Sequence, residues 1–229
     1  MALIEIAHLD KTYNTSAVPV HAVRDVNLEI DKKEFMAVVG PSGSGKTTLL
    51  NIVGGLDKAT GGKVSIDGID LSTISAGKLV DFRLGHIGFV FQAYNLIPVF
   101  TARENVEFIM LLQGVDKKER ETRAKELLQQ VGLEDRMDTR PAQLSGGQQQ
   151  RVAVARALAS HPRFVLADEP TANLDSESAE SLLDLMEELN EKHEMTFIFS
   201  THDDRVMRRA RRIVTLQDGT VVEDSVTKS

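Results

Sequence analysis

The sequence contains no cysteine among its 229 residues. That absence excludes a disulfide framework, a thiolate metal site and a cysteine nucleophile. No stretch approaches the ~20 consecutive apolar residues of a membrane-spanning helix, and the start, MALIEIAHLDKTYN, does not have the basic and then apolar pattern of a signal peptide. We therefore expect a cytoplasmic protein with no direct membrane insertion, which reaches a membrane only through a partner.

Basic residues are outnumbered, with 27 Lys and Arg against 34 Asp and Glu, which gives a net charge of −7 and a pI near 5.4. An acidic chain of this kind is a poor candidate for non-specific nucleic-acid binding, and we expect no nucleic-acid partner. The overall charge does not exclude a local basic patch on the surface. The length and a hydrophobic fraction of 41% suit one α/β domain, or one domain with an inserted subdomain.

Short apolar stretches alternate along the chain with longer stretches of helical spacing. The pattern predicts strands within residues 3–9, 21–30, 35–40, 61–72, 86–92, 163–169, 195–202 and 212–224. It predicts helices at 46–56, within 102–139, and at 145–160 and 178–193. Strand–helix alternation favours a mainly parallel sheet flanked by helices. The early strands indicate a small antiparallel β subdomain. We expect a single domain over 1–229, with its core and β subdomain at 1–92 and 156–229 and a helical subdomain at 93–155.

Residues 40–47 read GPSGSGKT, which matches G-x-x-x-x-G-K-[ST] in full. The segment follows a predicted strand and precedes a predicted helix, which is the context that supports a phosphate-binding loop. Its backbone N–H groups and the helix N-terminus would hold phosphates. The cofactor-binding candidates are Gly40, Pro41, Ser42, Gly43, Ser44, Gly45, Lys46 and Thr47. The alternative is a tight turn with a solvated lysine. The motif assigns the α/β fold to the P-loop NTPase class.

The stretch FVLADEP contains a predicted strand that ends in two acidic residues. Asp168 and Glu169 point to opposite sides of the strand, so they suit different tasks. Asp168 and the Thr47 hydroxyl suit Mg²⁺, whereas Glu169 suits the polarisation of an attacking water. A capping or solvated acid pair is the alternative, and it is weakened by the nearby phosphate loop, because α/β sheets bind ligands at strand carboxyl ends.

Three further residues are candidates by position alone. Gln92 and His202 each end a predicted strand, so Gln92 could contact Mg²⁺ or the water and His202 could reach the γ-phosphate. Tyr13 could stack on an adenine base. Each residue, taken singly, also fits an ordinary structural position.

The stretch LSGGQQQR places glycines at the start of a predicted helix. Ser145 and Gln148 match a capping box. The capping box does not explain Gly146 and Gly147, since glycine costs about 1 kcal/mol per helix position relative to alanine. Glycine at a helix N-terminus suits the approach of an anion. A second anion site needs another nucleotide, or the far side of the same nucleotide held by a second subunit.

Taken together, these segments resemble the ATP-binding subunits of ABC transporters over the whole chain. The resemblance rests on Tyr13, GPSGSGKT, Gln92, LSGGQ, FVLADEP, ANLD at 172–175 and His202. It implies ATP and Mg²⁺ as cofactors and a head-to-tail dimer. In that dimer each ATP lies between the phosphate loop of one copy and the Ser-Gly-Gly-Gln of the other.

The resemblance also implies a role for each matched residue. Tyr13 would stack on adenine, and residues 43–48, including Thr48, would hold phosphates and Mg²⁺. Asp168 would hold Mg²⁺ through water, with Thr47 and Gln92 as further metal contacts. Glu169 would be the general base, with His202 and Gln92 as the other catalytic residues. Ser145, Gly147 and Gln148 would complete the partner's site, and Asp175 would communicate across the dimer. Ala172 stands where the family often has serine.

Within the family, residues 53–68, 86–108 and 200–213 resemble the lipoprotein-releasing (Lol) and macrolide-exporter (MacB) type. That resemblance implies an integral membrane permease as partner and a peripheral location on the inner face of the cell membrane. Apolar YNLIPVF, at 94–100, would then be a docking surface or plain subdomain core. The functional alternative is a soluble ABC-type ATPase that is not coupled to transport.

Overall fold

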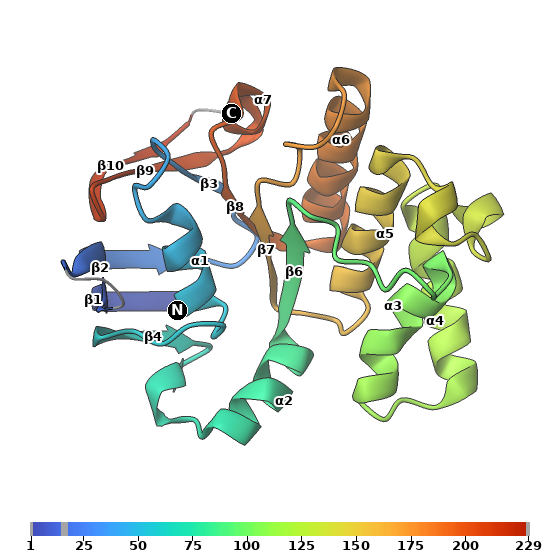
Figure 1. Cartoon of the computed structure of the whole chain (residues 1–229), viewed down its shortest axis with the longest axis horizontal. Helices are drawn as coiled ribbons and strands as arrows, with labels where there is room; N and C mark the ends of the chain where they lie inside the picture. The colour runs from blue at the N-terminus through green and yellow to red at the C-terminus, as the bar shows by residue number, and fades with distance from the viewer. Residues whose placement is uncertain (1, 15–17, 228–229) are drawn as a thin grey trace.

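The computed structural model describes residues 2–14 and 18–227, and Figure 1 shows two β-sheets with helices around them. The larger sheet has six strands in the order β10-β9-β3-β8-β7-β6. Its neighbouring pairs are parallel except for β9 and β10, which pair antiparallel. The strands are β3 (Phe35–Val39), β6 (Ile87–Phe91), β7 (Phe164–Asp168), β8 (Thr196–Ser200), β9 (Arg212–Gln217) and β10 (Thr220–Val226). The prediction of a mainly parallel sheet is confirmed.

The smaller sheet has four strands in the order β2-β1-β4-β5, all antiparallel. They are β1 (Ile4–Tyr13), β2 (Val20–Ile30), β4 (Gly61–Ile66) and β5 (Ile69–Asp70). Helix α1 (Lys46–Val53) lies between the two sheets (Figure 1), and its residues Leu49, Leu50 and Ile52 join a core formed by both. The predicted antiparallel β subdomain is therefore present. Burial of α1 on both sides fixes the position of the loop that precedes it.

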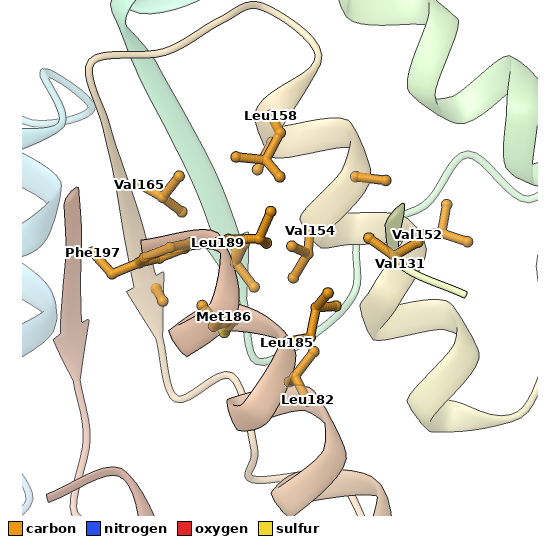
Figure 2. Close-up of a cluster of buried hydrophobic side chains, with 14 of the residues drawn as sticks. Val131, Val152, Val154, Leu158, Val165, Leu182, Leu185, Met186, Leu189 and Phe197 are labelled. Carbon is orange, nitrogen blue, oxygen red and sulfur yellow. The ribbon is translucent and has the colours of Figure 1, made fainter. Parts of the chain in front are cut away.

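Helices α5 (Gly146–Leu158) and α6 (Ser176–His193) cover the other face of the larger sheet. Figure 2 shows Val154 and Leu158 of α5 and Met186 and Leu189 of α6 directed toward Val165 and Phe197 of the sheet. The apolar residues of both helices recur at helical spacing, so one face of each is buried. This packing holds the start of α5 at a fixed place relative to the sheet.

Helices α3 (Ala102–Leu112) and α4 (Lys117–Gln130) pack against α5 at the side away from the small sheet. Short 3₁₀ turns at Glu134–Arg136 and Pro141–Gln143 complete this region, and another lies at Leu71–Thr73. Gly132 follows α4 with φ 71°, as a helix C-terminus favours. Since α5 packs on α3 and also on β6, the division at 92/93 and 155/156 stays a prediction.

The sequence pattern did not predict α2 (Ala76–His86) or α7 (Asp204–Arg209). Helix α2 buries only Phe82 and α7 only Val206, so neither has the repeated apolar positions that reveal a helix. The predicted strand stretch 212–224 forms a hairpin of β9 and β10, and Asp218 and Gly219 at its turn both have positive φ, 49° and 83°. No helix in the described part of the chain combines the length and the hydropathy that a membrane crossing requires.

Candidate functional site

A cleft of about 580 Å³ opens at the carboxyl ends of the parallel strands. Residues 40–43 and 45–48 line one wall, and Gln92, Glu169 and His202 line the other. The structure therefore brings the predicted phosphate loop together with three residues that are distant in the sequence. The nearest of them, Gln92, is 44 positions after Thr48. Ligands of α/β proteins bind at this edge of the sheet.

The phosphate loop is held in shape by backbone contacts. Gly40 and Gly45 have φ 148° and 102°, and a Cβ on either would lie 2.1 Å from a main-chain oxygen, that of Leu216 or Ala22. Only glycine fits both positions. Lys46, which is 8% exposed, donates from Nζ to the oxygens of Gly40 and Pro41 at 2.8 and 3.1 Å. The ammonium group is thus held against the main chain at the start of the loop.

Two polar features of the loop lack a partner inside the described chain. Helix α1 has no side-chain cap, and its first turn carries no acidic residue. The Ser44 Oγ atom is buried and makes no hydrogen bond to another described residue. An uncapped helix N-terminus attracts anions through its free N–H groups and its dipole. The loop is therefore suited to a phosphate group.

Three side chains with oxygen atoms suited to a divalent cation lie in or beside the loop. The Thr47 hydroxyl donates to Asp168 Oδ1 at 3.2 Å, and Gln92 lines the same cleft. Hydroxyl, carboxylate and amide oxygens beside a phosphate suit Mg²⁺, which prefers hard oxygen ligands and keeps several waters. The donor set therefore fits the predicted metal site of Thr47, Gln92 and Asp168. Asp168 itself does not line the cleft.

Glu169 and His202 form a direct pair at the cleft wall. Glu169 Oε1 lies 2.6 Å from His202 Nδ1, and Oε2 accepts from the Thr201 hydroxyl at 3.0 Å. The Glu169 side chain is 16% exposed and that of His202 is 75% exposed. Glu169 has φ 46°, a conformation rare for a non-glycine residue and frequent at functional sites. The carboxylate is thus a positioned acceptor that faces solvent through the cleft.

Tyr13 takes a different position from the other candidates and does not line the cleft. Its hydroxyl donates to Asp57 Oδ2 at 2.7 Å, and Lys11 Nζ lies 4.6 Å from its ring centre. Burial, followed by the hydrogen bond to Asp57, raises the pKa of the Tyr13 hydroxyl. Asp57 anchors the ring at its hydroxyl end and Lys11 lies over the ring, and stacking on adenine stays a prediction.

The start of α5 lies outside the cleft of its own chain, since residues 145–148 are absent from its lining. The predicted capping box is present: Ser145 N donates to Gln148 Oε1 at 3.0 Å, and Gln148 N donates to Ser145 Oγ at 3.3 Å. A Cβ on Gly146 would lie 2.7 Å from the Tyr94 hydroxyl oxygen, and one on Gly147 would lie 3.0 Å from Ser178 Oγ. The fold thus adds its own reason for both glycines, which the sequence interpretation did not include.

Asp175 also lies outside the cleft and begins helix α6. Its carboxylate accepts from the N–H of Ser178 at 2.9 Å and from the Ser178 hydroxyl at 2.7 Å. Ser178 therefore joins the cap of α6 to Gly147 at the start of α5. The role of Asp175 in communication between subunits stays a prediction.

Sequence reasoning missed three features of this site. His21 and Ala22 of β2 line the cleft, Thr201 donates to Glu169, and Tyr94 covers Gly146. None of these belongs to a spaced motif. Only Thr201 had a signal in the sequence that could have identified it, because it is a polar residue at the end of a buried strand, next to His202.

Comparison with known proteins places this site in a family. The ABC transporter family model matches residues 23–172. An uncharacterized ABC transporter ATP-binding protein of Thermotoga maritima is 49% identical over 96% of this chain and 93% of its own. The macrolide export ATP-binding/permease protein MacB of Salmonella choleraesuis is 44% identical over 97% of this chain, which spans 34% of MacB.

A solved structure gives the same result for the fold. The dimeric post-hydrolysis state of the cassette MJ0796 of Methanocaldococcus jannaschii, bound to ADP and Pi, superposes with a TM-score of 0.90. It is 43% identical, and the match covers 99% of both chains. The chain belongs to the ABC transporter family, as one of its ATP-binding cassettes.

Proposed function

We propose that this chain binds ATP with Mg²⁺ and hydrolyses it to ADP and phosphate as the motor subunit of a membrane transporter. The observation that carries the proposal is the joining of the phosphate loop, Gln92, Glu169 and His202 in one cleft. The relationship to a cassette solved with ADP and Pi supports the reaction.

The chain's own groups divide the chemistry among them. The loop N–H groups and Lys46 hold the β- and γ-phosphates, and His202 contacts the γ-phosphate. Glu169 accepts a proton from the attacking water while the oxygen of the water bonds to the γ-phosphorus. The bond between the γ-phosphorus and the bridging oxygen breaks, and that oxygen leaves with ADP. Thr47, Asp168 and Gln92 would hold Mg²⁺, which would neutralise charge on the phosphate oxygens.

A second copy of the chain completes the site. Ser145–Gln148 lie at a capped helix start outside their own cleft, so they are available to a nucleotide held by another subunit. MJ0796 is dimeric in a nucleotide-bound state, which supports a head-to-tail dimer with two shared ATP sites. Binding of ATP would then close the dimer, and hydrolysis would open it.

The membrane partner is a permease of the MacB or lipoprotein-releasing type, which places the chain on the inner face of the membrane. The identity to MacB supports this assignment, and MacB carries a permease on the same polypeptide according to its name. Val99, within YNLIPVF, is 68% exposed, as a docking surface requires. The soluble, uncoupled ATPase is the second candidate, and co-purification with a permease would decide between them.

The exchange Glu169→Gln tests the hydrolytic mechanism. The amide keeps the size of the side chain and removes the base, so ATP binding stays and turnover falls at least ~100-fold. The variant should form a stable dimer in ATP and none in ADP, as measured by size-exclusion chromatography. Wild-type turnover in this variant would refute the general-base role. Lys46→Ala is the matched control, which loses both binding and dimerisation.

A further inference from the structure

The two strands that carry Gln92 and Glu169 stop pairing just before those residues. The parallel ladder between β6 and β7 ends with Phe91 opposite Asp168. Glu169 then turns away with φ 46°, and Pro170 has no N–H to donate. The main chain therefore does not continue the tie between the two strands into the catalytic region.

A side chain from helix α5 supplies this missing tie. Gln150 is fully buried, at 0% exposure, and its Nε2 donates to the oxygen of Phe91 at 3.2 Å and to that of Pro170 at 2.8 Å. Both partners are carbonyl oxygens, so the amide group must present its NH₂ to them. One carboxamide thus joins the residue before Gln92 to the residue after Glu169.

The other end of the same carboxamide is unsatisfied. Gln150 Oε1 is buried and makes no hydrogen bond to any described residue. A buried polar atom without a partner destabilises the fold, and an apolar side chain of similar size would avoid that penalty. The contribution of Gln150 that an apolar side chain could not replace is therefore its pair of N–H donors.

Two neighbouring side chains hold the same loop. Asn173 Nδ2 donates to the oxygen of Gln92 at 2.9 Å. Arg156, six residues after Gln150 on α5, donates to the oxygens of Asn95 and Tyr94 at 2.5 and 2.9 Å. Phe91, Tyr94 and Asn95 are thus fixed to α5, whose start carries the Ser145 cap, while Gln92 between them is held by Asn173.

We propose that Gln150 is a positioning residue for ATP hydrolysis, which holds Gln92 and Glu169 at a fixed separation and fixes both to helix α5. The proposal rests on the proposed function. Gln150 touches no part of the phosphate loop, so its loss leaves nucleotide binding in place and lowers the rate of the chemical step. Small displacements of a catalytic group reduce rate strongly, by as much as ~100-fold for about 1 Å.

The test compares Gln150→Met with Gln149→Met. Methionine keeps the length of the side chain and removes both donors. Gln149 lies next on the same helix and donates only to Leu144 O at 3.1 Å, so it is a matched control. We expect Gln150→Met to lower kcat about 10- to 100-fold with the KM for ATP within about twofold, and Gln149→Met to leave both near the wild-type values.

Binding of a fluorescent ATP analogue and the melting temperature are measured in parallel. Equal kcat in Gln150→Met and wild type overturns the proposal, as does a parallel loss of kcat and analogue binding, which would indicate a structural role. If Gln150→Met does not fold, Gln150→Asn, which keeps a shorter donor, decides by the same criteria. Absence of ATP hydrolysis in the wild-type chain together with its permease would instead refute the proposed function.

Discussion

The phosphate loop and the start of α5 both place glycine at a helix N-terminus, but the fold constrains them differently. Gly40 and Gly45 have positive φ and face main-chain oxygens, whereas Gly146 and Gly147 do not have positive φ and have side-chain atoms as their nearest neighbours. Helix α1 has no side-chain cap, while α5 has a complete capping box. The first glycines are thus required by the loop's own shape. Contacts within one chain explain the second pair only in part, as expected if these glycines also contact a nucleotide held by a second subunit.

The largest effect is expected from Gly45→Ala. A Cβ would lie 2.1 Å from the Ala22 oxygen at φ 102°, so the loop must change its path. We expect nucleotide affinity to fall at least ~100-fold and the free energy of unfolding to fall by about 2 to 4 kcal/mol. Binding of an ATP analogue and urea denaturation measure the two effects. Normal affinity would show that the loop can bind phosphate in another conformation.

A mixture of Ser145→Arg and Lys46→Ala proteins tests whether α5 acts on another subunit. Each variant alone should be inactive, because one lacks the capping residue at the shared site and the other lacks the phosphate lysine. A heterodimer of the two variants has one intact site, between the phosphate loop of the Ser145→Arg subunit and the start of α5 of the Lys46→Ala subunit. We therefore expect the mixture to regain ATPase activity that neither variant has alone, up to about half of the wild-type value if every subunit is in a heterodimer. Inactivity with heterodimers confirmed by cross-linking would contradict the shared site.

Gly146→Ala separates the two reasons for glycine at the start of α5. Alanine gains about 1 kcal/mol of helix propensity over glycine, and the contact at 2.7 Å involves only the Tyr94 hydroxyl. We expect an unchanged or slightly higher melting temperature and ATPase activity about 10-fold lower, because the methyl group meets the phosphate of the partner's ATP. Addition of Tyr94→Phe removes the hydroxyl and serves as the control. Recovery of activity in that double variant would assign the glycine to the fold alone.

The smallest effect concerns a contact between the segment that follows Glu169 and the segment that follows His202. Asp203 accepts from the Thr171 hydroxyl at 2.6 Å and from Arg205. Burial opposes its ionisation, but the hydrogen bonds from Arg205 and Thr171 outweigh it and lower the pKa of Asp203 from 3.8 to about 2. A lowered carboxyl pKa stabilises the fold above the unfolded pKa, and this stability disappears as pH falls through the folded value.

Thr171→Val removes one of these hydrogen bonds and keeps the shape of the side chain. We expect it to reduce the free energy of unfolding by about 1 kcal/mol near neutral pH, with the difference from wild type shrinking as pH falls from about 4 to about 2. Denaturation curves over that range provide the measurement. A difference in unfolding free energy that stays constant with pH would show that the pKa of Asp203 does not depend on the hydrogen bond from Thr171. Thr73→Val, at an exposed 3₁₀ turn with one main-chain hydrogen bond, is the control.

The sequence was sufficient for most of the elements because their patterns are local. Alternating and apolar stretches gave the strands, and the repeated apolar face of 178–193 gave α6. Helices α2 and α7 were missed, since each buries a single residue and is held by its place in the fold. The expected helical stretch 102–139 is two helices and a 3₁₀ turn, with Gly114 and Gly132 at positive φ between them.

By itself, the sequence determined the family, the phosphate loop and the acidic strand end, because these depend on residue types at fixed short spacing. Only the tertiary structure decided which distant residues meet. It paired Glu169 with His202 and Thr201, placed Tyr94 against Gly146, and joined Phe91 and Pro170 through Gln150. Those contacts depend on the order of strands in the sheet and on the packing of α5, and no local pattern encodes either.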